Sequence, residues 1–186
     1  MTVKKKLIVN CDGLCEPVNP AGVACYGFVV KQDEDTILYT EYGLVSSVKP
    51  FFPESNSNAA EYGSAIKAME WLVKNGYAAN NNNDDDYQIT LRGDCQLTIR
   101  KLKSTTYSSR AAAIIPLYDR AFKLRSRFGQ DGITFEWVKR EQNREADELA
   151  KKAYFWALKR YPKLQKRVRD HWATMLWLER TIYLDL

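Results

Sequence analysis

Four acidic residues stand out because each lies at the edge of an expected strand or helix: Asp12, Glu61, Asp94 and Asp147. Carboxylates held on rigid elements are good ligands for hard divalent cations such as Mg²⁺ or Mn²⁺. Two such ions roughly 4 Å apart can activate water and stabilise the leaving oxygen of a phosphodiester. If the four acids converge, the sequence predicts metal-dependent cleavage of nucleic acid. Taken singly, each acid also fits a turn cap, a first-turn helix acid or an ion pair.

The first third of the chain alternates apolar and polar residues, which predicts strands at residues 5–11, 22–31 and 36–44. Short turns between them indicate an antiparallel meander, followed by a loop at 45–57. Asp12 is expected at the end of the first strand, where Gly13 lets the backbone turn.

The pattern then changes to a helical period. A helix is expected over residues 58–75, capped by Ser57 or Asn58, with Glu61 on the core-facing stripe of its first turn. The later expected elements are a strand at 88–92, helices at 95–103 and 110–128, a strand at 133–138, and a helix capped by Asn143 that runs to about residue 160. Asp94 follows a strand, and Asp147 faces inward near a helix start.

This order predicts an α/β fold with a five-stranded mixed sheet, three antiparallel strands followed by two parallel ones, flanked by helices. A C-terminal helical extension completes it. We expect a catalytic domain over residues 1–158 and a basic and apolar extension over 159–186.

The composition is 45% hydrophobic and 27% charged, which is ordinary for a soluble globular protein. The sequence shows no membrane-spanning apolar run and no signal peptide, so the expected location is cytoplasmic, without a membrane partner. Four cysteines without a CxxC pair and a single histidine, His171, argue against structural zinc and favour reduced thiols. The acidic triplet 84–86 is expected to be a solvated loop.

Four stretches resemble, in order and spacing, the motifs of type 1 ribonuclease H. They read DGLC with NPAG within residues 12–22, SNAAEY at 57–62, GDCQL at 93–97 and NREADELA at 143–150. The wording after the first Asp-Gly is closest to the archaeal-type branch. The likeness covers roughly residues 5–158.

The resemblance implies the ribonuclease H fold and cleavage of the RNA strand of RNA/DNA hybrids with two Mg²⁺ or Mn²⁺ ions. It implies that Asp12 bridges both ions, that Asp147 helps hold the ion that activates water, and that Glu61 and Asp94 hold the ion at the leaving group. Glu61 would also lie near a ribose 2′-hydroxyl. Substrate contacts are implied for Gly13, Asn19, Ser57, Asn58, Gln96 and Asn143. Some archaeal-type members also cut double-stranded RNA, which is therefore a second expected substrate.

The sequence departs from the family in three places. Many relatives carry a histidine in the loop before the last aspartate, whereas residues 139–143 contain none. We hypothesise that Arg140, or a metal-bound water, takes its place. Ala21 stands where a glycine is common, and segment 103–110 is too short for the basic protrusion that some relatives use to grip hybrid.

The C-terminal part is basic and then apolar. Residues 151–169 carry eight Lys and Arg and no acid, which fits either phosphate binding or a solvated helix face. The apolar end predicts packing on the domain or on a second subunit. Residues 165–172 faintly resemble a sliding-clamp binding motif, so a clamp and a homodimer are both open as partners.

Two other classes of protein compete with this interpretation. One is a non-catalytic nucleic-acid-binding module on the same fold, because fold does not imply function. Four converging carboxylates argue against it, since without metal they repel phosphate. The other class is a transposase-like or proofreading nuclease, and the first and last motifs favour ribonuclease H over it.

Overall fold

A five-stranded sheet organises the computed structural model, which describes residues 5–78, 87–104, 114–129 and 131–184, with side chains of the last helix to residue 175. The strands are β1 (Lys5–Glu16), β2 (Val23–Gln32), β3 (Thr36–Leu44), β4 (Tyr87–Gly93) and β5 (Ile133–Trp137). The helices are α1 (Ser57–Lys74), α2 (Gln96–Lys103), α3 (Ile115–Arg125), α4 (Arg144–Arg160) and α5 (Pro162–Leu184), with short 3-10 turns η1 (Ser126–Phe128) and η2 (Arg140–Gln142).

The strand order across the sheet is β3-β2-β1-β4-β5. The β1–β2 and β2–β3 pairs are antiparallel, and the β1–β4 and β4–β5 pairs are parallel. The predicted mixed sheet is therefore confirmed, with the change from antiparallel to parallel pairing at β1.

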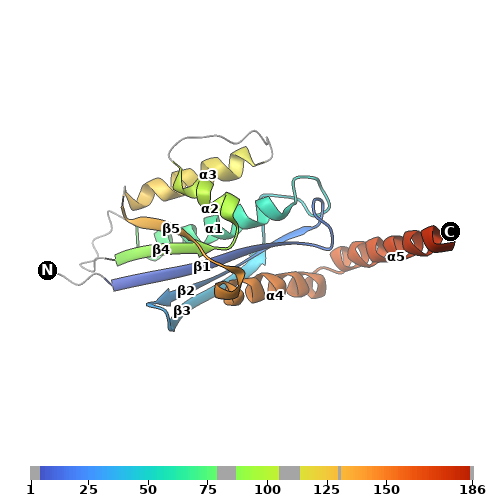
Figure 1. Ribbon diagram of the computed structural model, residues 1–186, viewed down its shortest axis with the longest axis horizontal. Helices are drawn as coiled ribbons and strands as arrows, with labels where there is room; N and C mark the ends of the chain where they lie inside the picture. The colour runs from blue at the N-terminus through green and yellow to red at the C-terminus, as the bar shows by residue number, and fades with distance from the viewer. Residues whose placement is uncertain (1–4, 79–86, 105–113, 130, 185–186) are drawn as a thin grey trace.

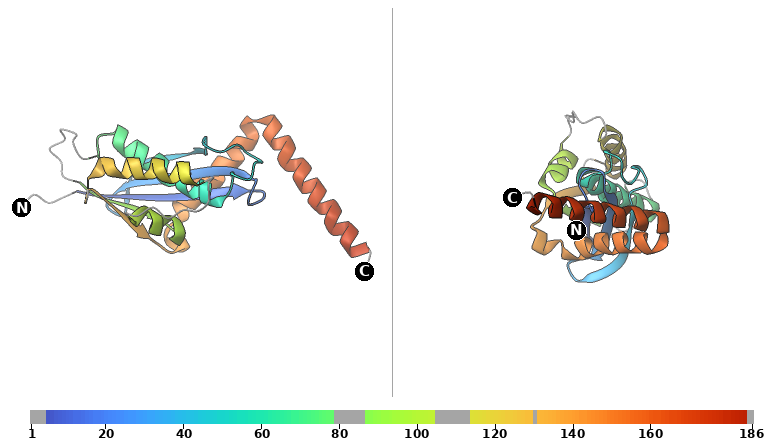
Figure 2. Two further views of the ribbon diagram at one scale, coloured as in Figure 1. Left: turned by 90° about the horizontal axis from the view of Figure 1, so that it is seen from above. Right: turned by 90° about the vertical axis from the view of Figure 1, so that its right-hand side faces the viewer.

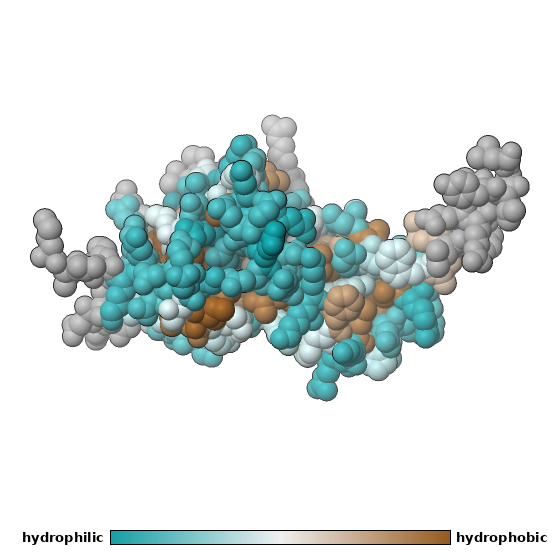
Figure 3. Space-filling model, turned by 60° about the horizontal axis from the view of Figure 1, so that its bottom comes forward, coloured by the Kyte–Doolittle hydropathy of each residue, from teal (hydrophilic) through white to brown (hydrophobic). Residues whose placement is uncertain are grey.

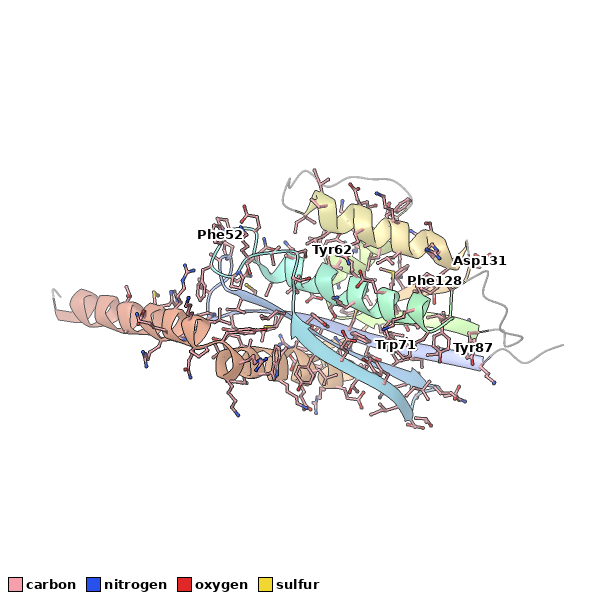
Figure 4. All side chains as sticks on the ribbon, turned by 180° about the vertical axis from the view of Figure 1, so that it is seen from behind. Phe52, Tyr62, Trp71, Tyr87, Phe128 and Asp131 are labelled. Atoms are coloured by element: carbon pink, nitrogen blue, oxygen red, sulfur yellow. The ribbon has the colours of Figure 1, made fainter. Side chains whose placement is uncertain are left out.

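Helices α1, α2 and α3 cover one face of the sheet and α4 covers the other, as Figure 1 shows. The main core lies under α1, where Val9, Phe28 and Met69 are fully buried. Tyr62 and Phe128 are buried in the same layer (Figure 4). These contacts hold α1 firmly against β1, which is the strand that carries the first acid.

Several element boundaries differ from the predictions. The first strand continues to Glu16 because its pairing with β2 runs on to Glu16 and Val23. The cap of α1 is Asn56, whose side-chain oxygen accepts the Ala59 N–H at 2.9 Å, so neither Ser57 nor Asn58 caps it. Because α1 begins at Ser57, Glu61 lies on its second turn.

Helix α3 begins at Ile115 with Pro116 in its first turn, where the missing proline N–H has no partner to lose. The predicted helix start at 110, residues 105–110 of the short segment 103–110 and the acidic triplet 84–86 lie outside the described residues. The domain boundary expected after residue 158 falls inside α4, which continues to Arg160.

The C-terminal extension is a single long helix, α5, that turns away from α4 and leads off from the body (Figures 1 and 2). Its beginning packs on the domain: Val168 is buried with Val23 and Tyr154, and the Arg167 guanidinium lies 4.3 Å from the Phe51 ring centroid. Further along, Trp172 is 50% exposed. The contacts with the domain are thus made by the first part of α5, and the packing expected for the apolar end stays a prediction. Within the described part of the chain, none of the helices combines the length and apolarity needed to cross a membrane.

Ala21 adopts a left-handed backbone conformation with a φ of 71°, and its N–H donates to the Ser55 carbonyl at 2.7 Å. This conformation costs an L-residue about 1–2 kcal/mol, which explains why a glycine is common here in relatives. We therefore expect Ala21→Gly to raise the free energy of unfolding by roughly 0.5–1 kcal/mol in urea titrations. Ala173→Gly, on the exposed side of α5, is the control and should lower it by a similar amount. An equal loss of unfolding free energy in both variants would contradict the strain at Ala21.

Candidate active site

The first acid lies where β1 separates from β4. Their parallel pairing ends at Asn10 and Arg92, while β1 continues beside β2 for six more residues. Asp12 is two residues beyond the separation, and Asp94 directly follows β4. Asp12 therefore lies inside β1, whereas we expected it at the end of the strand. It still lies at an opening of the sheet, because the neighbouring strand has already ended.

Gly13 allows α1 to come close enough to deliver Glu61. A Cβ added at Gly13 would lie 2.2 Å from the carbonyl carbon of Ala60 and 2.3 Å from the backbone nitrogen of Glu61. No side chain fits at such distances. The expected turn at Gly13 is wrong, because β1 runs straight through it. The glycine serves a close approach of two backbones.

Three of the four acids converge. One carboxylate oxygen from each of Asp12, Glu61 and Asp94 lies within 4.8 Å of the other two. Burial and the charges of Asp94 and Asp147 raise the pKa of Asp12 to about 8. Burial, and then the charge of Asp12, likewise raise the pKa of Glu61 well above its usual range. A backbone hydrogen bond from Gly13 opposes both shifts.

This donor set fits a divalent cation. Three carboxylates crowded at this distance repel one another when ionised, and a bound cation would offset both this repulsion and the cost of burying their charges. Oxygen ligands without histidine or thiolate in the group favour hard cations of the Mg²⁺ or Mn²⁺ type.

The fourth acid approaches from the other face of the sheet. Helix α4 crosses β2 at Gly27, the cross-strand partner of Asp12, where an added Cβ would lie 2.5 Å from the Ala150 nitrogen. Asp147, on the first turns of α4, is close enough for its charge to raise the pKa of Asp12. Its own oxygens are paired, Oδ1 with Arg140 at 3.0 Å and Oδ2 with Lys151 at 2.5 Å. Asp147 therefore lies beside the other three acids, and its carboxylate is paired with the positively charged side chains of Arg140 and Lys151.

The pKa of Asp147 reflects this pairing. Burial disfavours its charged form, but the hydrogen bonds from Lys151 and Arg140 outweigh burial and lower its pKa. The Arg140 guanidinium, 69% exposed, has a pKa raised further above its high ordinary value by the bond to Asp147. Arg140 cannot pass a proton at neutral pH, so it cannot take over proton transfer from the family's histidine. What it supplies is a positive charge beside Asp147.

Asn143 was expected to cap α4 and to bind substrate, and it does occupy the N-cap position of α4, while its side chain is engaged inside the protein. Its side chain is 1% exposed, and its Nδ2 donates to the Cys11 carbonyl at 3.0 Å. Its Oδ1 accepts from Asn10 Nδ2 at 3.1 Å, and Asn10 also reaches the Gln142 carbonyl. It makes no side-chain cap bond to the helix. The two asparagines fasten the turn before α4 to the strand that carries Asp12.

The other expected substrate contacts lie around the acids. Asn19 and Ser57 bind each other, through Nδ2 to Oγ at 2.8 Å and through the Ser57 N–H to Oδ1 at 2.9 Å. Asn58 and Gln96 are exposed, each in the first turn of its helix. The backbone of Gly13 is engaged with the acids themselves.

Sequence reasoning missed four positioning contacts. The Asp147–Lys151 pair could have been found, because a spacing of four on a helix brings opposite charges together. The Trp137 indole N–H donates to the Asp94 carbonyl at 2.9 Å, and no sequence pattern indicates it. The same is true of the Asn10–Asn143 bond, which joins residues 133 positions apart. No sequence pattern indicates that α4 approaches the backbone of Gly27 so closely.

The sheet order, the covering helices and the acids at the opening define a protein of the ribonuclease H fold. The N-terminal RNase H domain of a Mycobacterium tuberculosis protein is 25% identical, with a TM-score of 0.65, covering 84% of this chain and 98% of that one. RNase H1 of the halophilic archaeon Halobacterium salinarum is also 25% identical, with a TM-score of 0.63 and coverages of 80% and 97%. LC11-RNase H1, solved in complex with an RNA/DNA hybrid, shares the fold at 24% identity and a TM-score of 0.65, covering 82% of this chain and 99% of that one.

A family model described as reverse transcriptase-like matches residues 10–153, and the chain belongs to that family. The resemblance to type 1 ribonuclease H is confirmed, and the similarity to the halophilic archaeal protein partly supports the archaeal-type branch. Helix α5 lies beyond the matched residues.

We expect Gly13→Ala to separate α1 from β1, because the new Cβ would overlap backbone atoms that cannot rotate away. The free energy of unfolding should fall by about 2 kcal/mol or more, and the rise in Tm produced by Mg²⁺ should shrink as Glu61 moves from Asp12. Gly93→Ala is the matched control, because its Cβ would meet Ile99 at an ordinary 3.4 Å. Full stability and Mg²⁺ response in Gly13→Ala would disprove the close approach.

We expect Asp12→Asn to stabilise the metal-free protein in a pH-dependent way. The pKa of Asp12 is about 8 when folded and near 3.9 when unfolded, so the folded state holds the proton more tightly. Stability from this group is complete below about pH 4 and is lost as the pH rises toward 8. In EDTA, the Tm advantage of Asp12→Asn should therefore grow across this window to roughly 10 °C, because a pKa change from about 3.9 to about 8 corresponds to about 5 kcal/mol and each kcal/mol to about 2–4 °C. Adding Mg²⁺ should reverse the order at pH 8, and a gap that does not change with pH would refute the assignment.

Proposed function

We propose that this protein is an endoribonuclease that hydrolyses the RNA strand of RNA/DNA hybrids with the help of Mg²⁺ or Mn²⁺, two ions per site. The convergence of Asp12, Glu61 and Asp94 at the opening between β1 and β4, in a chain of this family and fold, carries the proposal. Relatives whose names state ribonuclease H, one of them bound to hybrid, support it. Double-stranded RNA is a second candidate substrate.

The three clustered carboxylates would hold the metal. When bound, Mg²⁺ supplies Lewis-acid stabilisation of charge on phosphoryl oxygens and lowers the pKa of water. The pKa of Asp12, about 8, means that this group would release a proton as it binds the cation. Metal binding to the crowded acids is therefore expected to depend on pH.

Asp147 has a different part. Its low pKa keeps it ionised at neutral pH, so it can orient a nearby water or share in holding the cation without first losing a proton. Arg140 and Lys151 hold its two oxygens in place. Both are half or more exposed, so they also offer positive charge to an incoming phosphate.

The polar residues around the acids fit a sugar-phosphate backbone. Asn19, Ser57, Asn58 and Gln96 present amide and hydroxyl groups at the starts of α1 and α2 and in the loop beside them. Glu61 lies among the acids on the α1 side, where it can meet a ribose 2′-hydroxyl, the group that separates RNA from DNA. This arrangement favours a substrate with at least one RNA strand.

The decisive test is cleavage of end-labelled RNA/DNA hybrid, with double-stranded RNA and DNA alongside, in Mg²⁺, Mn²⁺ and EDTA. We expect metal-dependent cutting of the RNA strand, and a loss of roughly a thousandfold or more in Asp12→Asn and Asp147→Asn, since removing a metal ligand forfeits several kcal/mol of charge stabilisation. Asp119→Asn, an exposed acid on α3, is the matched control.

Arg140→Ala and Arg140→Lys belong in the same assay. If the charge of Arg140 positions Asp147, Arg140→Ala should lower kcat, Arg140→Lys should partly restore it, and neither variant should change the pH profile. Tight hybrid binding without any cutting would instead favour the non-catalytic binding module, and cutting of double-stranded RNA would widen the substrate class.

A further inference from the structure

A groove of about 460 Å³ lies in the bend between α4 and α5. The chain turns at Tyr161, whose backbone is extended, and α5 then starts with Pro162. The walls include Tyr154, Phe155 and Leu158 from α4 and Val168, Arg169 and Trp172 from α5. One wall is thus built from the helix that lies beyond the family match.

Two large aromatic side chains at this groove are exposed to solvent. Phe155 is 61% exposed and Trp172 is 50% exposed. Figure 3 shows apolar side chains gathered where α4 meets α5, among hydrophilic ones. Exposed aromatic side chains beside a groove are typical of a surface that receives a flat, apolar group.

The charge around the groove indicates a polyanion. Residues 151–169 hold eight of the chain's 28 Lys and Arg, which leaves 20 against 23 Asp and Glu elsewhere. The basic bias of the protein therefore resides entirely in this segment. Lys159, Arg160, Lys163 and Arg169 are exposed, and none of them has an acidic partner among the described residues.

The groove and Asp147 lie along the same side of α4. Asp147, Lys151, Phe155 and Leu158 follow one another at spacings of four, four and three, so they share a helix face. Eleven residues of helix separate Asp147 from Leu158, or roughly 16 Å. A stacked strand covers that distance in about five nucleotides at roughly 3.4 Å each.

We propose that the α4–α5 groove binds unpaired nucleotides of a strand that leaves the candidate active site, with bases stacking on Phe155 and Trp172 and a phosphate held by Arg169. Aromatic rings beside cations are the general chemistry of single-strand binding. In a duplex the bases are already stacked on one another and could not use the rings, and an apolar helix of a protein would not need the cations. The inference rests on the proposed function only in taking the strand to come from the same substrate.

The test is the binding of RNA/DNA hybrid in EDTA, measured by fluorescence anisotropy. The substrates are duplexes of about 12 base pairs that are blunt or carry an overhang of about eight nucleotides at either RNA end. An overhang of this length spans the distance from the acids to the groove. Wild type should bind one overhang substrate roughly tenfold more tightly than the blunt one. Trp172→Ala and Phe155→Ala should remove most of that gain and leave blunt binding unchanged. Phe122→Ala, a 43%-exposed ring on α3, should keep the gain.

The charge is tested separately. Arg169→Gln should reduce the slope of log K against log salt for the overhang substrate by about 0.7, the value for one contact to a single strand. Lys74→Gln, an exposed lysine at the end of α1, is the control and should leave the slope unchanged. Both aromatic substitutions are at exposed positions, and circular dichroism checks that the variants fold.

Three outcomes would overturn the proposal: no gain from either overhang, equal losses on blunt and overhang substrates, or a wild-type dimer in light scattering that Trp172→Ala converts to monomer, which would assign the groove to a second copy. Because binding is read without metal, a protein that cuts no hybrid would refute the proposed function and leave this measurement decisive by itself.

Discussion

The contact between the backbones of α1 and β1 at Gly13 is the constraint on which the candidate site depends. It brings a helix carboxylate against a strand carboxylate at a separation that no side chain at position 13 would permit. The resulting repulsion is sustained because the core beneath α1 is densely filled, with Phe28 and Met69 fully buried. Packing of the apolar layer thus keeps the acidic side chains together although burial and mutual repulsion disfavour their charged forms. A bound cation would relieve that cost.

The two faces of the sheet treat their acids differently. On the α1 face, burial and mutual repulsion raise the pKa values of Asp12 and Glu61. On the α4 face, Asp147 is paired with Arg140 and Lys151, and its pKa is lowered. One opening in the sheet therefore contains neighbouring carboxyl groups whose pKa values are shifted in opposite directions. Such opposite shifts among neighbouring groups are common in active sites.

Sequence reasoning predicted the mixed five-stranded sheet and the flanking helices, and it singled out three acids that the fold brings together, because periodicity and the residues beside Gly93 are local signals. It failed where the contacts of a residue are decided by something distant in the chain. Gly13 looked like a turn residue, yet its neighbour is α1; Asn143 looked like a side-chain cap, yet its side chain bonds to Asn10 and Cys11. Side chains of the same type serve either purpose, and only the tertiary contacts distinguish them. The boundary of β1 was missed for the same reason, since pairing with β2 extends it.

The buried amide pair has a consequence for how this chain can vary. Asn10 occupies a strand position that is 6% exposed, and Asn143 is buried almost completely. Replacing Asn143 removes a donor from the Cys11 carbonyl, and replacing Asn10 leaves the Asn143 Oδ1 without its donor, each at a cost of about 1–3 kcal/mol. Replacing both with apolar residues does not avoid this cost, because the Cys11 and Gln142 carbonyls then lose their side-chain donors. Positions 10 and 143 are therefore expected to keep their amide side chains together through evolution.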